Sequence, residues 1–392
     1  MRRRSFLAAI TAAGLAASAL PALAQETVKI GLIIPLTGPF TTTGKQLEAA
    51  VKLYMQQNGT TVAGKKIELL VRDDAGRAEN TARIATELLT NDKVSILAGF
   101  GLTPLAMATA PIATNGKVPM VVMMAGTSII TERSPYIVRT SFTLGQSAVI
   151  VADWASQNKI KKVVTMVTDY APGHDAENSF ADQFTKQGGT VVEKIRVPIQ
   201  NPDFAPFLQR VLDAKPDALY VFTPSGVGSI LMKQFVERGL DKSGIRLIGP
   251  GDITDDDILN GFGDVAIGVV TAHFYSAAHP SPKNKEYVAA FRKANANMRP
   301  NFASVGGYDG IHLIYEALKK TKGSTDGDAL LAAMKGLKWE SPRGPISIDP
   351  ETRDIIQTIY MRKVEKVNGE LYNVEFASFP DVKDPVKAAK KK

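Results

Sequence analysis

Residues 97–128 read LAGFGLTPLAMATAPIATNGKVPMVVMMAGTS. The apolar start predicts a buried strand that runs through a glycine-rich turn into Thr103-Pro104, a pair typical of a helix N-cap followed by proline at the first helical position. A second predicted strand, residues 119–124, ends in the small and hydroxylic residues 125–128. Because the carboxyl ends of neighbouring parallel strands meet at one sheet edge, these two turns predict a pocket rich in N–H and hydroxyl donors, suited to a small carboxylate.

A purely structural explanation of the same residues stays open. The Thr103 hydroxyl can cap its own helix, and glycine is common in strand-to-helix turns that bind nothing. Residues 97–128 contain no Asp, Glu, His or Cys. The stretch therefore favours binding over catalysis.

The N-terminus predicts the compartment. Three arginines at positions 2–4, an apolar run over residues 7–20 and Ala-Leu-Ala at 22–24 predict a signal peptide over residues 1–24. The run is too short to span a bilayer. Arg-Arg before Ser-Phe-Leu is also typical of a twin-arginine signal, so the Tat and Sec routes both stay open. We expect a protein of the periplasm.

Composition excludes several functions. The chain contains no cysteine, which removes disulfides, thiolate metal sites, cysteine nucleophiles and a lipid-bearing cysteine anchor. The formal net charge of +8 owes much to the signal peptide and to the lysines near the C-terminus. No basic stripe interleaved with aromatic residues is present, so we expect no nucleic-acid partner.

The remaining chain alternates apolar strands with amphipathic helices. Over residues 28–140 this order predicts a parallel, doubly wound sheet, and residues 146–248 repeat the architecture. Val-Asn-Gly-Glu at 367–370 predicts a hairpin near the end. We expect an α/β protein with two Rossmann-like lobes joined by a multi-strand hinge. The predicted division is a first lobe of residues 25–143 with 275–344, a second lobe of residues 144–274 with 345–380, and a basic tail of residues 381–392.

Segments along nearly all of the mature chain carry a family resemblance. They are IGLIIPLTGPFTTTGKQ at 30–46, LLVRDDAGRAENTARIATELLTNDKVSILAG at 69–99, MATAPIATNGKVPMV at 107–121, RTSFTLGQ at 139–146 and YDGIHLIYEAL at 308–318. The chain resembles the solute-binding proteins of ABC importers of the Leu/Ile/Val-binding family, which have the type I periplasmic-binding fold. The resemblance implies a monomeric receptor without a cofactor, which closes over a small carboxylate or amino acid and delivers it to an inner-membrane permease.

The resemblance also implies roles for individual residues. Thr103 lies where the family places a hydroxyl on the ligand carboxylate, and the next turn supplies the Ala125 N–H and the Thr127 hydroxyl. From the second lobe, Tyr170 would stack on the solute and Asp252 would pair an ammonium group. The predicted ligand-binding residues are Thr43, Thr103, Ala125, Thr127, Tyr170, Pro224, Ser225, Asp252 and Tyr308.

Three positions depart from the amino-acid binders. The family's acidic residue aligns on Gly251, one position before Asp252, and Thr43 and Pro224-Ser225 stand where those binders can carry tyrosines. A branched-chain amino acid is the leading expectation. An aromatic or short aliphatic acid, which needs the Thr103 site but no ammonium partner, stays open.

Other titratable groups have plainer explanations. We expect Asp73-Asp74 to form an Asx turn, Asp255-Asp256-Asp257 to open a short helix at residue 258, and His174-Asp175 to begin a helix as a solvated cap. His273 and His279 lack a third nearby ligand, so we expect no metal site.

Two further predictions concern the role of Arg343 and a competing function. Arg343 is predicted to pin the hinge rather than reach the ligand. The competing function is an exported hydrolase that uses the aspartates at 73–74 or the pair at 174–175, but the chain has no G-x-S-x-G elbow and no zinc motif. A DNA-binding regulator of this fold would need a headpiece where the export signal stands.

Overall fold

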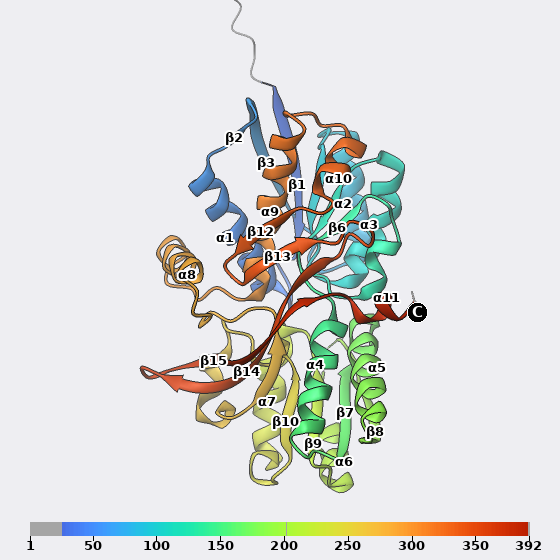
Figure 1. The fold of residues 1–392 in the computed structure, drawn as a ribbon, viewed down its shortest axis with the longest axis vertical. Helices are drawn as coiled ribbons and strands as arrows, with labels where there is room; N and C mark the ends of the chain where they lie inside the picture. Colours follow the sequence, from blue (N-terminus) through green and yellow to red (C-terminus); the bar gives the residue numbers. More distant parts are fainter. Residues whose placement is uncertain (1–25, 201, 391–392) are drawn as a thin grey trace, which may run out of the picture.

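Two lobes lie one above the other along the long axis, and several chain segments cross the waist between them (Figure 1). This computed structural model describes residues 26–200 and 202–390. The predicted signal peptide, residues 1–24, lies outside that part. Within it, no helix is long and apolar enough to cross a membrane.

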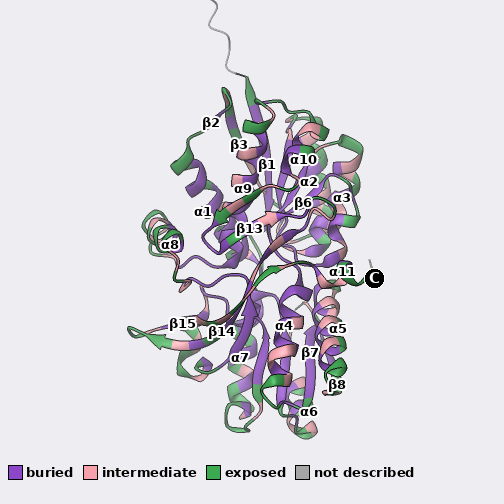
Figure 2. Ribbon diagram, viewed as in Figure 1, coloured by how far each residue is buried: buried purple, intermediate pink, exposed green. Residues whose placement is uncertain are grey.

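The upper lobe is built on a six-stranded sheet in the order β2-β3-β1-β4-β5-β6. Its strands are β1 Thr27–Ile34, β2 Thr61–Val62, β3 Lys65–Asp73, β4 Ile96–Gly99, β5 Met120–Val122 and β6 Ile137–Arg139. All neighbours pair in parallel except the short β2 with β3. The central strands are apolar along nearly their whole length because helices bury both faces, as Figure 2 shows. The predicted doubly wound sheet is confirmed.

Helices cover this sheet on its two faces. They are α1 Thr41–Asn58, α2 Ala78–Thr90, α3 Thr103–Gly116, α9 Phe302–Lys320 and α10 Gly327–Met334. Helices α1 and α9 pack against each other on one face, and α2 and α3 on the other. The upper lobe therefore combines the N-terminal third of the chain with a much later segment.

The second sheet has nine strands in the order β12-β13-β14-β11-β10-β9-β7-β8, with β15 paired to β14. They are β7 Lys162–Thr168, β8 Thr190–Val197, β9 Ala218–Phe222, β10 Arg246–Pro250, β11 Val270–His273, β12 Lys338–Ser341, β13 Gly344–Ile348, β14 Ile355–Val367 and β15 Glu370–Val382. Pairing is parallel from β8 to β11 and antiparallel from there to β12 and β15. The hairpin at 367–370 is confirmed.

Long strands carry this sheet across the waist (Figure 1). Its helices are α4 Leu144–Gln157, α5 Ala171–Lys186, α6 Ala205–Ala214 and α7 Gly228–Glu237, and α8 Pro282–Ala294 lies beside the waist. Short 3-10 turns connect the elements: η1 Ser128–Glu132, η2 Ser225–Val227, η3 Leu240–Lys242, η4 Gly251–Thr254 and η5 Leu259–Ala266.

Two helices differ from the sequence-based expectation. Helix α5 begins at Ala171, because Tyr170 is the N-cap and a proline occupies the first turn. His174-Asp175 therefore lies inside the helix and is not its cap. Part of the predicted tail forms α11, Pro385–Lys390, where the buried Lys387 ammonium binds the Asp354 carboxylate.

A buried ion pair holds the waist together. The Arg343 guanidinium lies 2.8 Å from Asp309 Oδ2 of α9, and both side chains are buried. Its nitrogens also donate to the carbonyls of Thr140 (2.5 Å) and Ser141 (3.0 Å), which follow β6 at the first crossover. Arg343 thus ties the first crossover to α9 and does not line the pocket, as expected of a residue at the hinge.

Removal of the Asp309 carboxylate should destabilise the protein strongly. Asp309→Ala leaves the Arg343 guanidinium buried without its counter-charge, so we expect the free energy of unfolding to fall by about 3–5 kcal/mol. Denaturant unfolding followed by circular dichroism measures this change. Glu316→Ala is the matched control, because this residue of the same helix pairs only with the exposed Lys319 and should cost less than about 1 kcal/mol. Equal effects of the two substitutions would contradict the assigned role of Arg343.

Candidate functional site

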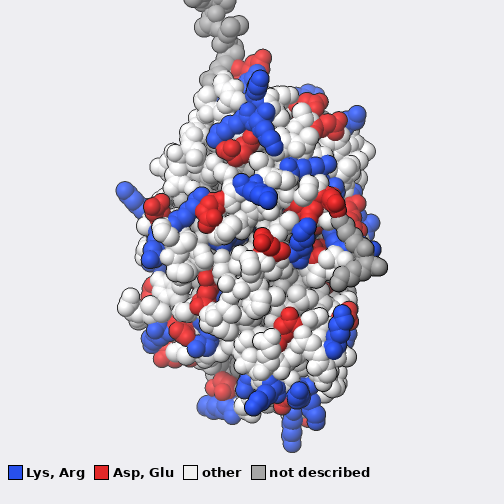
Figure 3. Space-filling model, in the orientation of Figure 1, with Lys and Arg blue, Asp and Glu red and all other residues white. Residues whose placement is uncertain are grey.

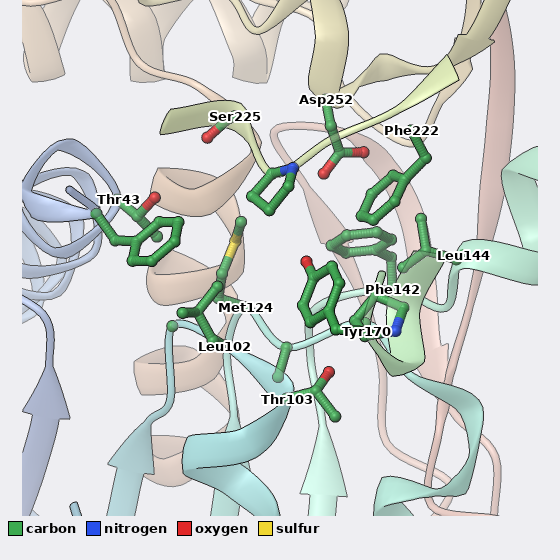
Figure 4. Close-up of a pocket in the computed structure, with 16 residues that line it drawn as sticks. Thr43, Leu102, Thr103, Met124, Phe142, Leu144, Tyr170, Phe222, Ser225 and Asp252 are labelled. Atoms are coloured by element: carbon green, nitrogen blue, oxygen red, sulfur yellow. The ribbon is translucent and has the colours of Figure 1, made fainter. Parts of the chain in front are cut away.

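A pocket lies between the lobes, where the carboxyl ends of strands from both sheets face each other (Figure 4). The cavity is small, with a volume of about 30 Å³. Most of its lining is apolar: Phe40, Leu102, Met124, Phe142, Leu144, Tyr170, Pro172, Phe222 and Pro224. A dry pocket of this kind strengthens each hydrogen bond to a bound solute.

The upper lobe contributes hydroxyl groups and a helix N-terminus. Thr103 lines the pocket, and its Oγ1 shares a hydrogen bond of 2.8 Å with Thr127 Oγ1. Thr127, which was also predicted to bind the ligand, is not part of the lining. Leu102, not Thr103, is the N-cap of α3, and no side chain caps this helix. The prediction that Thr103 is the N-cap was therefore wrong by one residue, and its hydroxyl is not used by its own helix. The positive end of α3 and the hydroxyl pair together suit an anion.

The neighbouring turn corrects one expected donor. The Ala125 N–H donates to the Phe100 carbonyl at 3.1 Å, so the fold itself uses this group. Ala125 nevertheless lines the pocket through its side chain and backbone. The resemblance placed an anion-binding N–H here, but the structure ties that N–H to the turn after β4.

Arg139 fixes this turn from behind. Its fully buried guanidinium forms an ion pair with Asp354 at 2.9 Å and donates to the carbonyls of Ala125 (3.0 Å) and Thr127 (2.6 Å). These bonds hold the backbone on both sides of residue 126. Sequence analysis gave Arg139 no role at the site, because the partners of an arginine at a strand end cannot be read from the chain.

The lower lobe contributes an aromatic wall. Tyr170 stacks on Phe222 with ring centroids 6.1 Å apart and an angle of 17° between the planes. Figure 4 shows the Tyr170 ring in the middle of the pocket with its hydroxyl pointing inward. Burial raises the pKa of this hydroxyl well above its ordinary value, so Tyr170 stays neutral. Pro224 and Ser225 line the same side, as predicted from the resemblance.

Asp252 is the one acidic residue of the lining. Burial raises the pKa of its carboxyl to about 7. Its Oδ2 lies 3.6 Å from Nε2 of the buried His273. A Cβ on Gly251 would lie 2.0 Å from an Arg362 guanidinium nitrogen and 2.7 Å from His273 Cβ, so an acidic side chain at this position would displace these groups.

Of the last two predicted residues, one lines the pocket and the other does not. Thr43, in the first turn of α1, is buried and lines the pocket. Tyr308 does not line it: its hydroxyl donates to Gln57 at 2.7 Å, and its ring packs edge-on against Tyr54 of α1. The structure thus places Tyr308 between α1 and α9, which corrects its expected position in the cleft.

The sequence did not predict the phenylalanines that line the pocket. Phe40, Phe142 and Phe222 carry no pattern that separates them from core residues. Only the closing of one lobe over the other gives them a common cavity. Their positions just after predicted strands and near turns were the one available signal.

The other acidic candidates serve the fold. Asp73 and Asp74 accept the N–H groups of residues two ahead, at 2.8 and 2.9 Å, which confirms the Asx-turn prediction. The aspartates at 255–257 directly precede the 3-10 helix η5, whose N-cap is Ile258, as predicted. Asp255 and Asp256 are also buried, Asp255 with Asn301 (2.9 Å) and Asp256 with Asn373 (3.2 Å). Partners distant in the sequence draw these carboxyls inward.

The histidines form separate pairs. His279 Nδ1 lies 2.8 Å from Glu375 Oε2, and His174 Nε2 lies 2.7 Å from Asp169 Oδ1. Across residues 26–200 and 202–390, no group of three His, Asp or Glu side chains could hold a metal ion.

The lobes meet tightly beside the pocket. A Cβ on Gly226 of η2 would lie 2.8 Å from the Pro39 carbonyl oxygen of the upper lobe. This contact belongs to the closed arrangement, because it joins a loop of one sheet to a loop of the other. Two lobes that each supply half of an enclosed pocket define a binding protein that closes over a solute.

Comparisons with known proteins agree with this class. A family model described as periplasmic binding protein matches residues 27–369. Leu/Ile/Val-binding protein homolog 6 of Brucella melitensis biotype 1 is 44% identical over 382 residues, covering 96% of this chain and 98% of the relative. The chain belongs to the periplasmic binding protein family.

Two solved structures from Rhodopseudomonas palustris are similar along almost the whole chain. A solute-binding protein of an ABC transporter from strain BisB5, in complex with 3,4-dihydroxybenzoic acid, is 66% identical with a TM-score of 0.91, covering 92% of this chain and 99% of its own. Another from strain HaA2, in complex with p-hydroxybenzoic acid, is 40% identical with a TM-score of 0.91, covering 93% and 100%. This protein is accordingly the extracytoplasmic solute-binding component of an ABC importer with the type I periplasmic-binding fold, and not an enzyme.

A side chain at residue 226 should hinder closure. Gly226→Ala forces the Pro39 backbone away, and such overpacking costs about 1–3 kcal/mol. We expect solute affinity to fall by a factor of roughly 5 to 150 while the ligand-free melting temperature changes little. Titration calorimetry and thermal melts measure the two quantities. Gly261→Ala is the control, since its Cβ would meet nothing within 4 Å. Unchanged affinity in Gly226→Ala would show that this contact is not part of the bound state.

The buried Asp252 carboxyl should leave a pH signature. Its pKa rises from 3.8 to about 7 on folding, so the folded state binds the proton more tightly and stability is lost as pH rises between those values. The Asp252→Asn variant has no titrating group at this position, so it does not lose stability in this way as the pH rises. We expect the unfolding free energy of the variant, relative to wild type, to increase by on the order of a few kcal/mol between about pH 4 and pH 7. Urea unfolding across that range measures the difference, and a difference independent of pH would contradict the raised pKa.

Proposed function

We propose that the protein captures an aromatic carboxylic acid in the periplasm and delivers it to an ABC permease of the inner membrane. The observation that carries this proposal is the stacked pair Tyr170 and Phe222, which shares one small pocket with the hydroxyl of Thr103. An aromatic acid is a flat apolar ring with a carboxylate at one end. The pocket offers an aromatic slot with uncharged donors at one end.

The carboxylate would lie at the N-terminus of α3. There the Thr103 hydroxyl, itself hydrogen-bonded to Thr127, would donate to it, and the positive helix end favours its charge. No basic side chain lines the pocket. Neutral donors hold an anion without burying a counter-charge, so the solute can still leave when the lobes open.

Closure would complete the site. The ring enters between Tyr170 and the apolar residues of the upper lobe, and the loop at Pro224-Ser225 seals it against Phe40. The crossing segments near Arg343 serve as the hinge. We infer a monomer, exported by the N-terminal signal through the Tat or Sec route, whose closed form is the one the permease recognises.

The complexes with hydroxylated benzoic acids in proteins 66% and 40% identical support this solute class. The second candidate is a branched-chain amino acid, favoured by the similarity to a Leu/Ile/Val-binding protein homolog. It would require the Asp252 carboxylate to be charged and to reach the ammonium group. Apolar surroundings that raise the pKa of Asp252 to about 7 work against a charged carboxylate in the empty site.

A thermal-shift screen of the mature protein tests the solute class. Benzoate or a hydroxybenzoate at a hundred times its dissociation constant should raise the unfolding free energy by about 2.7 kcal/mol, and leucine should not. A shift with leucine alone would refute the aromatic proposal in favour of the second candidate.

Thr103→Val tests the carboxylate site. Loss of a hydrogen bond to a charged group costs about 1.5–3 kcal/mol, so affinity for an aromatic acid should fall roughly 10- to 150-fold. Thr114→Val is the matched control on the same helix, where the hydroxyl bonds Ala110 and Ser134 away from the pocket. Calorimetry on both variants measures the change. Affinity that survives Thr103→Val would place the carboxylate elsewhere.

A further inference from the structure

Asp252 differs from the other polar groups of the lower lobe wall. The Ser225 hydroxyl is hydrogen-bonded to Asp255, and the Thr223 hydroxyl donates to the Pro224 carbonyl at 3.2 Å. Asp252 is only 3% exposed, yet its Oδ2 has no hydrogen-bond partner within the described part of the chain. A buried oxygen without a donor is costly, and folded proteins rarely keep one without a use.

The neighbours of Asp252 do not supply the missing donor. His273 Nε2, at 3.6 Å, is beyond hydrogen-bond distance. The Arg362 guanidinium donates instead to the carbonyls of Gly251 (3.3 Å) and Tyr275. Since Asp252 lines the pocket, a solute bound there can supply the missing donor.

The position of Asp252 defines where that donor must be. Figure 4 shows its carboxyl group hanging from the lower lobe into the pocket, on the side opposite Thr103, with the Tyr170 ring between them. On a benzene ring, the para position points directly away from the carboxylate. A carboxylate at Thr103 therefore directs a para substituent toward Asp252.

We propose that Asp252 determines specificity by accepting a hydrogen bond from a ring hydroxyl of the solute, so that the protein selects para-hydroxylated aromatic acids over those without a donor. This inference rests on the proposed aromatic-acid function. A site that keeps an unpaired buried acceptor discriminates against analogues that cannot fill it, because the acceptor then stays unpaired in the complex. An apolar substituent of the same size would remove water from Asp252 without donating a hydrogen bond to it.

The test compares 4-hydroxybenzoate with 4-methylbenzoate, which has a similar size but no donor. Titration calorimetry is done on wild type, Asp252→Leu and the control Asp264→Leu, whose exposed carboxylate pairs with Lys366 in the same lobe. We expect wild type and Asp264→Leu to prefer the hydroxyl compound by at least about 10-fold. In Asp252→Leu this preference should fall below about 3-fold, because 4-methylbenzoate gains affinity and 4-hydroxybenzoate loses it.

Each outcome separates the two proposals. A preference retained in Asp252→Leu, or no preference in wild type, overturns the role of Asp252 while leaving an aromatic-acid receptor. Wild type that binds neither benzoate but binds leucine overturns the proposed function, and this inference with it. Binding of 4-methylbenzoate by Asp252→Leu shows that the variant is folded and that its pocket is intact.

Discussion

One buried guanidinium connects the solute site to the waist. Arg139 sits at the end of β6 and gives its N–H groups to the Asp354 carboxylate and to the carbonyls of the turn from Ala125 to Thr127. Its charge is tolerated in the interior because the Asp354 carboxylate and the carbonyls of a second segment meet it. The same bonds hold the turn that aims Thr127 at its partner hydroxyl. Without this residue the pocket would lose the rigidity of its anion-binding end.

The waist is a chain of such buried polar contacts. Asp354 also binds Lys387 of α11, and the Ser128 N–H, just after the binding turn, donates to Asp175 of the lower lobe at 2.8 Å. Arg343 and Asp309 form the second ion pair. One apolar cluster runs from the upper lobe through the waist into the lower lobe, and each lobe has a further apolar cluster of its own. The outer face shown in Figure 3 mixes both signs of charge.

The pocket separates two recognition tasks between the lobes. In the proposed function, the uncharged donor of the upper lobe binds the carboxylate, while the aromatic rings and the Asp252 carboxyl of the lower lobe bind the rest of the solute. Closure would remove water from both halves and so strengthen their discrimination.

The sequence by itself determined the strand and helix order, the α/β class and most element positions, because alternating apolar strands and amphipathic helices are local patterns. It also located Thr103 and the lower-lobe loops at the pocket, since strand ends are visible in the chain. Only the tertiary structure decided that the Ala125 N–H is occupied, that Tyr308 packs between helices and that the last lysines fold into α11. Each of these depends on a partner far away in the sequence. Local sequence patterns predict the element in which a residue lies, but the packing of distant segments decides which groups its side chain contacts.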